Sequence, residues 1–493
     1  MIKILNKKIV LEILLIAMII LVISPNILLK PLGDMDEVWN YNFGNNISNG
    51  QIPYKEFSML QTPFTAFFSG IVLALTSNSL LTMRILAIIL SVAILFLIYK
   101  ILEKLKINKS ISICTIIAMT LLSNKFLRFD YNFFVAFFVL LIIYLEISLN
   151  QNKLSSNIII GIVAGLAFIT KQTIGAFACM GIVLYHLAFE IYKAKKNNEK
   201  IQIKNILYRI LGATIPILLF ALYLLITGSL GDFIDYTILG ISTFSNTIKY
   251  TNLFKNDLFL LALYIPINFI IMLIYSVRKK DRKLFIIFIM SIIMFIIAFP
   301  ISDDIHFMIG IIPSCIGISY LLDKMFRKIY TKKLEFLKYF MEALSLLLVI
   351  FFIGKGTYGL IKEYGEEKYF CKLKHFENIP TTIETEQGIK EIQEYIQSCN
   401  KNVYILNFDA ALYMIPLDRY NKDYDMLMNG NFGGKGAKGL IERIKSEKDA
   451  VYLILSKDKP KNWQHPGEVT DYIEKNLTHK GSIEKFEIYE NIE

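Results

Sequence analysis

Ionisable residues are scarce in this sequence: Asp, Glu, Lys and Arg make up 19% of its 493 residues, and there are five histidines. The five cysteines include no Cys-x-x-Cys pair and no Cys/His spacing of the kind that holds a metal ion. Heptads, solenoid repeats and low-complexity tracts are missing as well. Apolar residues are abundant instead, at 54% of the chain with a mean hydropathy of +0.48. Such a composition lies outside the range of ordinary soluble domains and indicates an integral membrane protein.

A basic stripe and a cleavable leader are also missing. The net charge is +11, but Lys and Arg cluster in short loops between apolar runs, as topology signals do. We therefore expect no nucleic-acid partner. The first apolar run, about Ile9 to Leu29, is long enough to cross a bilayer and has no small-residue cleavage site. It is predicted to stay in the chain as a transmembrane helix, which places the protein in the cell membrane.

The apolar runs predict a multi-pass helical protein. A helix needs about 20 apolar residues to cross a bilayer, and the intervening charges mark where each crossing ends. We predict about eleven spans, at residues 9–29, 82–100, 111–127, 133–150, 157–170, 173–192, 205–228, 257–277, 284–300, 308–323 and 334–354. The run 157–192 is broken only at Thr170-Lys171-Gln172, and we interpret it as a helical hairpin that turns at Lys171, since one helix of that length is too long.

One apolar segment, Pro63–Leu75, is not counted as a span, because it is short and contains Pro63, Ser69 and Gly70. Counting it would place the lysine cluster at residues 100–109 outside the cell and would scramble the cytoplasmic bias of basic loops. We therefore expect an interfacial or re-entrant helix within a first outer loop at 30–81. This arrangement puts the N-terminus inside and the C-terminus outside.

Beyond about Gly356 the composition becomes that of a soluble domain. Residues 402–408 and 450–456 have the pattern of buried strands, and 389–396, 439–444 and 468–476 that of amphipathic helices. We predict two domains, a transmembrane module at 1–356 and a small extracytoplasmic α/β domain at 357–493. Cys371 and Cys399 both fall in the second domain, and the sequence leaves open whether they form a disulfide.

The first outer loop holds the residues best suited to chemistry. Asp34, Asp36 and Glu37 follow closely on the end of the first span. Carboxylates at that depth meet a reduced dielectric, so at least one of them is expected to have a raised pKa and to suit general-base catalysis. The alternative is a solvated interfacial turn in which an aspartate caps a helix.

Several motifs occur in a fixed order along the chain. Asp36-Glu37 comes directly after the first span, and Gly50-Gln-Ile-Pro-Tyr-Lys-Glu-Phe57 and Thr62-Pro63 follow; next come Leu81-Thr-Met-Arg84, Phe129-Asp130 and Gly161-Ile-Val-Ala-Gly-Leu-Ala-Phe-Ile-Thr-Lys-Gln172. This series resembles the GT-C membrane glycosyltransferases, and most closely the bacterial relatives of the protein O-mannosyltransferases and of the lipid A aminoarabinose transferase. The resemblance covers most of residues 1–325. It extends to the C-terminal domain only in position and class.

The resemblance implies an inverting glycosyltransferase. A sugar would pass from a polyprenyl-phosphate donor to a hydroxyl of an envelope glycan, lipid or protein, on the outer face of the membrane. It implies Asp36 as the base, Glu37 as the residue that orients Asp36 or the acceptor, and Asp34 as a reserve base or positioning group. Asp130 and Tyr54 would help to position the acceptor or the donor.

The resemblance also implies cations at the donor phosphate, and Arg84, Arg128, Lys171 and His306 lie at outer-facing ends of spans. For each of these assignments the residues leave an alternative open. The two arginines and the lysine also fit side chains that reach the lipid headgroups. Asp130 equally fits a helix cap, and Tyr54 fits an interfacial aromatic residue.

One segment departs from the family pattern. Relatives carry an Arg-Tyr pair before the tenth span, where this chain has Asp303-Asp304-Ile305-His306. Three interpretations are open for His306: a turn residue, a phosphate contact, or a ligand of a divalent cation shared with Asp303 and Asp304. The outer loop at 228–256 is expected to form part of a lid over the donor.

Two rival functions share this topology. A transporter or flippase of lipid-linked sugars usually carries ionisable groups near the bilayer midplane and repeated halves, and this sequence shows few such charges and no repeat. A lipid-linked oligosaccharide ligase or polymerase needs the same outer base and phosphate site, and so stays open as an alternative.

Overall fold

The structure, a computed structural model, describes residues 7–124, 126–198, 200–201, 203–243, 247–330, 335–365, 367–421, 424, 427–461 and 465–491. The chain forms two compact units, and each is discontinuous in sequence. The first consists of Met1–Leu29, Ile85–Leu219 and Thr247–Glu367, and the second of Lys30–Arg84, Phe220–Asn246 and Lys368–Glu493. The second unit thus joins the acidic loop to the C-terminal region. The domain limits 1–356 and 357–493 stay a prediction.

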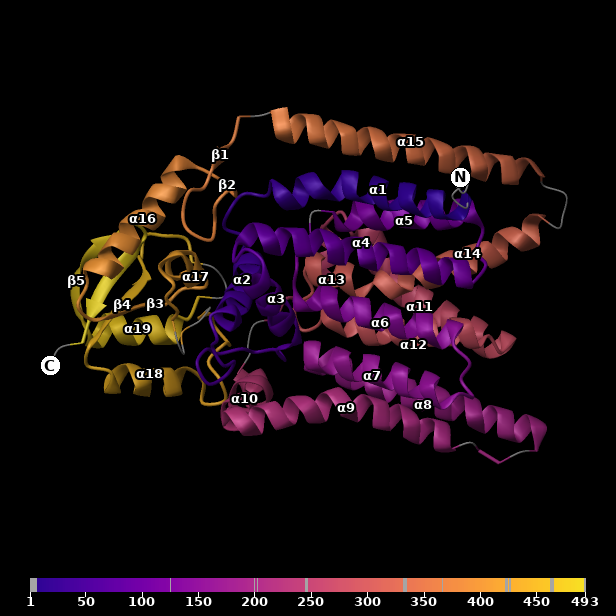
Figure 1. Ribbon diagram of the computed structural model, residues 1–493, viewed down its shortest axis with the longest axis horizontal. Helices are drawn as coiled ribbons and strands as arrows, with labels where there is room; N and C mark the ends of the chain where they lie inside the picture. The colour runs from indigo at the N-terminus through magenta and orange to yellow at the C-terminus, as the bar shows by residue number, and fades with distance from the viewer. Residues whose placement is uncertain are drawn as a thin grey trace. The chain divides into compact units, whose positions relative to one another are not determined.

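Helices build the first unit (Figure 1). They are α1 (Lys7–Leu28), α4 (Leu80–Lys104), α5 (Lys109–Ser123), α6 (Tyr131–Ser148), α7 (Leu154–Thr170), α8 (Gln172–Asn197), α9 (Ile203–Thr227), η3 (Tyr250–Lys255), α11 (Phe259–Lys279), α12 (Arg282–Phe295), η4 (Ile296–Ala298), α13 (Asp304–Gly310), α14 (Ile312–Tyr330) and α15 (Glu335–Gly365). The first turn of α4 and the last turns of α9 belong to the second unit. Figure 1 shows α1 and α15 side by side within the first unit.

Among the described residues, seven helices are long and apolar enough to cross a membrane, or eight if the bent pair α13 and α14 forms one span. Three more, α3 (Phe64–Leu75), α5 and α7, are apolar but shorter. The multi-pass helical architecture is therefore confirmed. The count of about eleven spans and the orientation with the N-terminus inside stay predictions.

Small residues allow close helix packing in the first unit. A Cβ added at Gly161 of α7 would lie 2.2 Å from the carbonyl oxygen of Arg209 in α9, and one at Gly165 would lie 2.4 Å from that of Ala213. The Gly-x-x-x-Gly motif therefore brings two helix backbones together, as small residues do in membrane bundles. The predicted hairpin at Lys171 is confirmed, since α7 ends at Thr170, α8 begins at Gln172 and the two helices pack together.

In the second unit, the acidic loop folds into the packed helices α2 (Met35–Ser48) and α3. A Cβ at Gly44 would lie 2.6 Å from the hydroxyl oxygen of Ser69, and one at Gly70 would lie 2.6 Å from a methyl carbon of Ile47. Glycine is therefore needed at both positions for these helices to approach. The segment at 63–75 is helical, as predicted, and its interfacial placement stays a prediction.

The C-terminal region is an α/β fold, as predicted. A four-stranded sheet has the order β3-β4-β6-β5, in which β3 and β4 are parallel and the other neighbours are antiparallel. Its strands are β3 (Asn402–Ile405), β4 (Ala450–Leu455), β5 (Thr478–Ile483) and β6 (Phe486–Glu490). Every residue of the central strand β4 is buried. The predicted strands correspond to β3 and β4, whereas the hairpin of β5 and β6 was not predicted.

Helices and short segments complete the second unit. They are α10 (Leu230–Phe233), η1 (Ile234–Leu239), η2 (Gly240–Thr243), β1 (Tyr369–Phe370), β2 (Pro380–Thr381), α16 (Ile383–Ser398), α17 (Ala410–Met414), η5 (Ile415–Leu417), α18 (Gly436–Ser446) and α19 (Gly467–Asn476). Helices α16, α18 and α19 contain the three predicted amphipathic helices. The side chains of α18 and α19 pack against β4 in one buried core, which includes Leu440, Ile444, Ile454, Val469 and Ile473.

Candidate functional site

The acidic loop is organised by the start of α2. Gly33 has a φ of +121°, a conformation that suits glycine, and it allows the chain to turn into the helix. Asp34 is the N-cap, with Oδ1 accepting a hydrogen bond of 2.9 Å from the backbone N–H of Glu37. Its other carboxylate oxygen pairs with the ammonium of Lys30. Asp34 therefore has the capping role that the sequence left open as an alternative.

Glu37 points into the protein and forms a buried ion pair with Arg84. The guanidinium donates from Nε and Nη2 to the two carboxylate oxygens, each at 2.9 Å. Nη1 also donates to the backbone carbonyl of Lys30 at 2.6 Å. Arg84 is fully buried and Glu37 is 7% exposed. A bidentate pair of this kind fixes the direction of α2 against the first turn of α4.

Asp36 lies in the first turn of α2 and is half-buried. Its backbone carbonyl accepts a hydrogen bond of 2.8 Å from the side-chain amide of Asn40. The positive end of the helix dipole favours a carboxylate at this place. Asp36 is thus a half-buried candidate base next to the buried Glu37. It lies in the first turn of a helix whose start is held by the Asp34 cap and by the ion pair of Glu37 with Arg84.

Tyr54 lies in the same unit, in a turn where its φ is +70°. Its hydroxyl donates a hydrogen bond of 2.9 Å to the backbone carbonyl of Gln61, and its ring meets Phe233 edge-on. Burial raises the pKa of Tyr54 well above its usual value, so the residue contributes its ring and not a phenolate.

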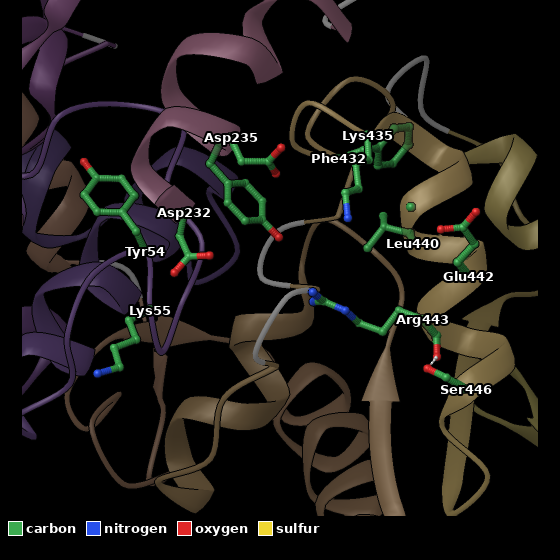
Figure 2. Close-up of a pocket in the computed structure, with 12 residues that line it drawn as sticks. Tyr54, Lys55, Asp232, Asp235, Phe432, Lys435, Leu440, Glu442, Arg443 and Ser446 are labelled. Carbon is green, nitrogen blue, oxygen red and sulfur yellow. Dashed lines mark hydrogen bonds between the residues drawn. The ribbon is translucent and has the colours of Figure 1, made fainter. Parts of the chain in front are cut away.

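Tyr54 borders a cleft of about 690 Å³. Segment 232–236 and Lys55 form one wall, and α18 with the residues just before it forms the other (Figure 2). The charged residues that line the cleft are Asp232, Asp235, Glu442, Lys55, Lys435 and Arg443. This volume lies within the usual range of about 300–1,000 Å³ for small-molecule sites.

In the first unit, Asp130 and Lys171 form a second polar group. Asp130 caps α6, with Oδ1 accepting a hydrogen bond of 2.8 Å from the backbone N–H of Phe133. The ammonium of Lys171 donates to Oδ1 of Asn132 at 2.5 Å and lies 5.1 Å from the centre of the Tyr131 ring. Burial lowers the pKa of Lys171 to about 8, although Asp130 opposes the shift. Arg128 is buried beside this group, and its Nε donates to the carbonyl of Phe126.

The third group surrounds His306, also in the first unit. Nδ1 of His306 lies 2.8 Å from Oδ1 of Asp303, which is the N-cap of α13. Burial raises the pKa of Asp303, but the hydrogen bonds from His306 outweigh it and hold the pKa below its usual value. Asp304 accepts a hydrogen bond of 2.7 Å from the side-chain amide of Asn256.

A cation at Asp303, Asp304 and His306 gains no support from this arrangement. Within the described parts of the chain, no group of three or more His, Cys, Asp and Glu side chains is placed to hold a metal ion. The aspartates instead cap a helix and bind an amide. The two cysteines of the C-terminal region, Cys371 and Cys399, are free thiols.

The predicted residues therefore fall into two sets. Asp34, Asp36, Glu37, Tyr54 and Arg84 lie in the second unit, where the first turn of α2 brings the three acids together and Arg84 joins them. The first unit holds the others, Asp130 with Arg128 and Lys171 in one group and Asp303 with Asp304 and His306 in another.

One buried charge cluster escaped the sequence analysis. The guanidinium of Arg209 in α9 pairs with Glu146 of α6 and donates a hydrogen bond of 2.8 Å to Oδ1 of Asn157. Arg209 and the charged end of Glu146 are fully buried. His186 of α8 is also fully buried, and its Nε2 lies 3.8 Å from Oε1 of Glu190. An ionisable residue inside an apolar run, such as Glu146, is the signal that would have pointed to this cluster.

Comparisons with known proteins agree with this fold. Residues 60–221 match the family described as dolichyl-phosphate-mannose-protein mannosyltransferase. A comparison with curated protein sequences gave no match.

The solved structures that resemble the chain include ArnT from Cupriavidus metallidurans in the apo state, with a TM-score of 0.57 at 12% identity over 98% of both chains. ArnT from the same organism bound to undecaprenyl phosphate gives 0.55 at 10% identity, again over 98% of both chains. The Archaeoglobus fulgidus oligosaccharyltransferase tethered with an acceptor peptide gives 0.54 at 12% identity, over 98% of this chain and 74% of that one. The resemblance drawn from the sequence is thus confirmed, and the chain has the fold of the GT-C glycosyltransferases.

Proposed function

We propose that the protein is an inverting glycosyltransferase that moves a sugar from a polyprenyl-phosphate donor to an envelope glycan, lipid or protein on the outer face of the membrane. The main support is the first turn of α2, where a half-buried Asp36 stands between a capping Asp34 and a buried Glu37. The GT-C fold and the family match at 60–221 support the same reaction class.

In the proposed reaction the acceptor hydroxyl attacks the anomeric carbon from the face opposite the phosphate. Asp36 takes the hydroxyl proton as the new glycosidic bond forms. The bond between the anomeric carbon and the phosphate oxygen breaks, and polyprenyl phosphate leaves with the electron pair.

Glu37 and Arg84 act as positioning residues in this proposal, because each is buried and bonded to the other. Arg84 therefore supports the base and is a weaker candidate for the donor phosphate than the sequence suggested. Arg128, Lys171 and His306 stay predicted contacts of that phosphate, as the resemblance implies. A cation next to the donor phosphate stabilises the negative charge that develops on the leaving group.

The test uses purified protein in lipid vesicles, a radiolabelled polyprenyl-phosphate sugar and envelope material as acceptor. We expect Asp36→Asn to lower the transfer rate by a factor of about 100 or more, as the loss of a general base does. Glu103→Gln, a change of the same kind at the end of α4, is the control and is expected to match wild type. Wild-type rates in Asp36→Asn, at equal amounts of folded protein, would refute the assignment of the base.

The buried charges Glu146, Arg209 and His186 favour a second candidate, a transporter or flippase of lipid-linked sugars. The same vesicles separate the two functions. A transferase consumes the donor and releases polyprenyl phosphate, whereas a transporter leaves the donor chemically intact and moves it between leaflets. Transfer of an oligosaccharide in one step, in place of a monosaccharide, would identify the ligase alternative.

A further inference from the structure

The cleft beside Tyr54 has no part in the proposed bond formation, and its lining combines aromatic with charged side chains. Aromatic rings of Tyr54, Tyr236 and Phe432 border it together with three acids and three bases. We propose that this cleft binds a saccharide segment of the acceptor, and hence that the acceptor is an extended glycan and not a small molecule. This inference rests on the proposed function and specifies its acceptor.

The cleft is a built feature of the second unit. Oδ1 of Asp235 accepts a hydrogen bond of 3.2 Å from the backbone N–H of Gly434. The hydroxyl of Thr243 donates to the carbonyl of Gly433, also at 3.2 Å. A Cβ at Gly434 would lie 2.7 Å from the Cβ of Leu239. Two hydrogen bonds and a contact that requires glycine therefore join the walls.

The side chains that face the cleft suit a neutral, hydroxyl-rich ligand. Figure 2 shows Asp232 on one wall and Lys435 and Arg443 on the other, with their charged ends toward the space between. Carboxylates accept hydrogen bonds from hydroxyl groups, and the cations donate to hydroxyl oxygens. Because acids and bases balance, a polyphosphate gains little net attraction. A lipid tail is disfavoured by the charged lining, because burying charged groups against hydrocarbon is costly.

The position of the cleft relative to Asp36 sets the length of the ligand. Phe43 lies two turns beyond Asp36 in α2, about 10 Å along the helix axis at 1.5 Å per residue. The ring of Phe43 stacks on Phe57, at 5.8 Å between ring centres. The carbonyl of Phe57 in turn accepts a hydrogen bond of 2.7 Å from the backbone N–H of Tyr54. The residues that line the cleft include none of α2, so a ligand that reaches both Asp36 and the cleft extends beyond the cleft and consists of more than one sugar unit.

The experiment measures how the acceptor's length affects transfer. Oligosaccharides released from envelope glycan and fractionated by length serve as acceptors for the vesicle-reconstituted protein. We expect Asp232→Asn and Arg443→Gln to raise KM for long acceptors at least fivefold. We also expect kcat, KM for the shortest acceptor and donor hydrolysis without acceptor to stay the same. Asp471→Asn and Arg419→Gln are the matched controls, since both residues are exposed in the same unit and do not line the cleft.

A direct binding measurement separates this proposal from the proposed function. Fluorescently labelled fractions of the same oligosaccharides are titrated into wild type and variants without donor. Weaker binding of long fractions by the two cleft variants, at unchanged thermal unfolding, supports the cleft even if no transfer occurs. Equal binding by wild type, cleft variants and controls would overturn the proposal, even if transfer by wild type upholds the reaction.

Discussion

The ion pair between Glu37 and Arg84 allows the sharpest test of how the candidate base is held. Arg84 is fully buried and both its Nε and its Nη2 donate to Glu37 at 2.9 Å. Replacing Arg84 by Met leaves the buried carboxylate of Glu37 without its counter-ion. Replacing Glu37 by Met leaves the buried guanidinium of Arg84 without its counter-ion. Removing one partner of such a pair typically costs about 3–5 kcal/mol.

Replacing both residues by Met removes the two charges together. A buried pair exchanged for apolar residues of similar volume is often nearly neutral. One cost remains, because the carbonyl of Lys30 loses the hydrogen bond from Arg84, and an unpaired buried carbonyl costs about 1–3 kcal/mol. We therefore expect the double variant to recover most of the stability that either single variant loses.

The assay is thermal unfolding of the purified protein in detergent, followed by gel filtration of the remaining folded fraction. For a unit of this size, 1 kcal/mol corresponds to roughly 2–4 °C in Tm. Each single variant is expected to melt about 6–20 °C below wild type, and Arg419→Met, an exposed control, within about 2 °C of it. Single variants that melt like the control, or a double variant whose losses simply add, would refute the coupled pair.

Three further predictions concern a helix cap and two sets of paired charges. Asp34→Ala is expected to lose about 1 kcal/mol of stability and Asp34→Asn almost none, because Asn also caps helices; thermal unfolding of the two variants checks this. Glu146→Gln is expected to lose about 3–5 kcal/mol of stability, since it leaves the buried Arg209 without its counter-ion, and a fall in detergent-extracted folded protein would show it. At Asp418 burial raises the pKa, but hydrogen bonds from Lys374 and His375 outweigh it and lower the pKa. The ionised Asp418 therefore stabilises the folded state above about pH 3.8, and this contribution is lost as the pH falls below that value. The difference in Tm between Asp418→Asn and wild type, measured at pH 3 and at pH 6, tests this.

Local patterns carried most of what the sequence predicted correctly. The helix at 63–75 and the turn at Lys171 follow from short apolar runs with clear breaks. Strand β4 is a continuous apolar run because all of its residues are buried inside the sheet, and the edge strand β3 still buries Val403 and Ile405. Strand β5 was missed because none of its residues is buried, three being exposed and three half-buried, so no apolar pattern marks it.

Pairings between distant segments were beyond the sequence. The sequence analysis assigns Arg84 to the lipid phosphate because Arg84 lies at the end of a predicted span. That position gives no indication of Glu37, with which Arg84 forms an ion pair in the structure. The cleft combines Asp232 with Arg443, and no spacing rule relates those positions. Glu146 and Arg209 were overlooked for a different reason: each is a single charge in an apolar run, and only the folded structure shows that the two side chains form an ion pair.

The three acids of the loop take different roles because of where each stands in α2. Asp34 precedes the helix, so its extended backbone lets the carboxylate fold back on the N–H of Glu37. Asp36 and Glu37 are consecutive helical residues and therefore point about 100° apart around the axis. Since Glu37 is directed to the buried Arg84, Asp36 must face another direction, and it is only half-buried. The ion pair therefore fixes the direction of Asp36 without contact between Arg84 and the acceptor, which is why we assign the proton transfer to Asp36 and the positioning to Glu37.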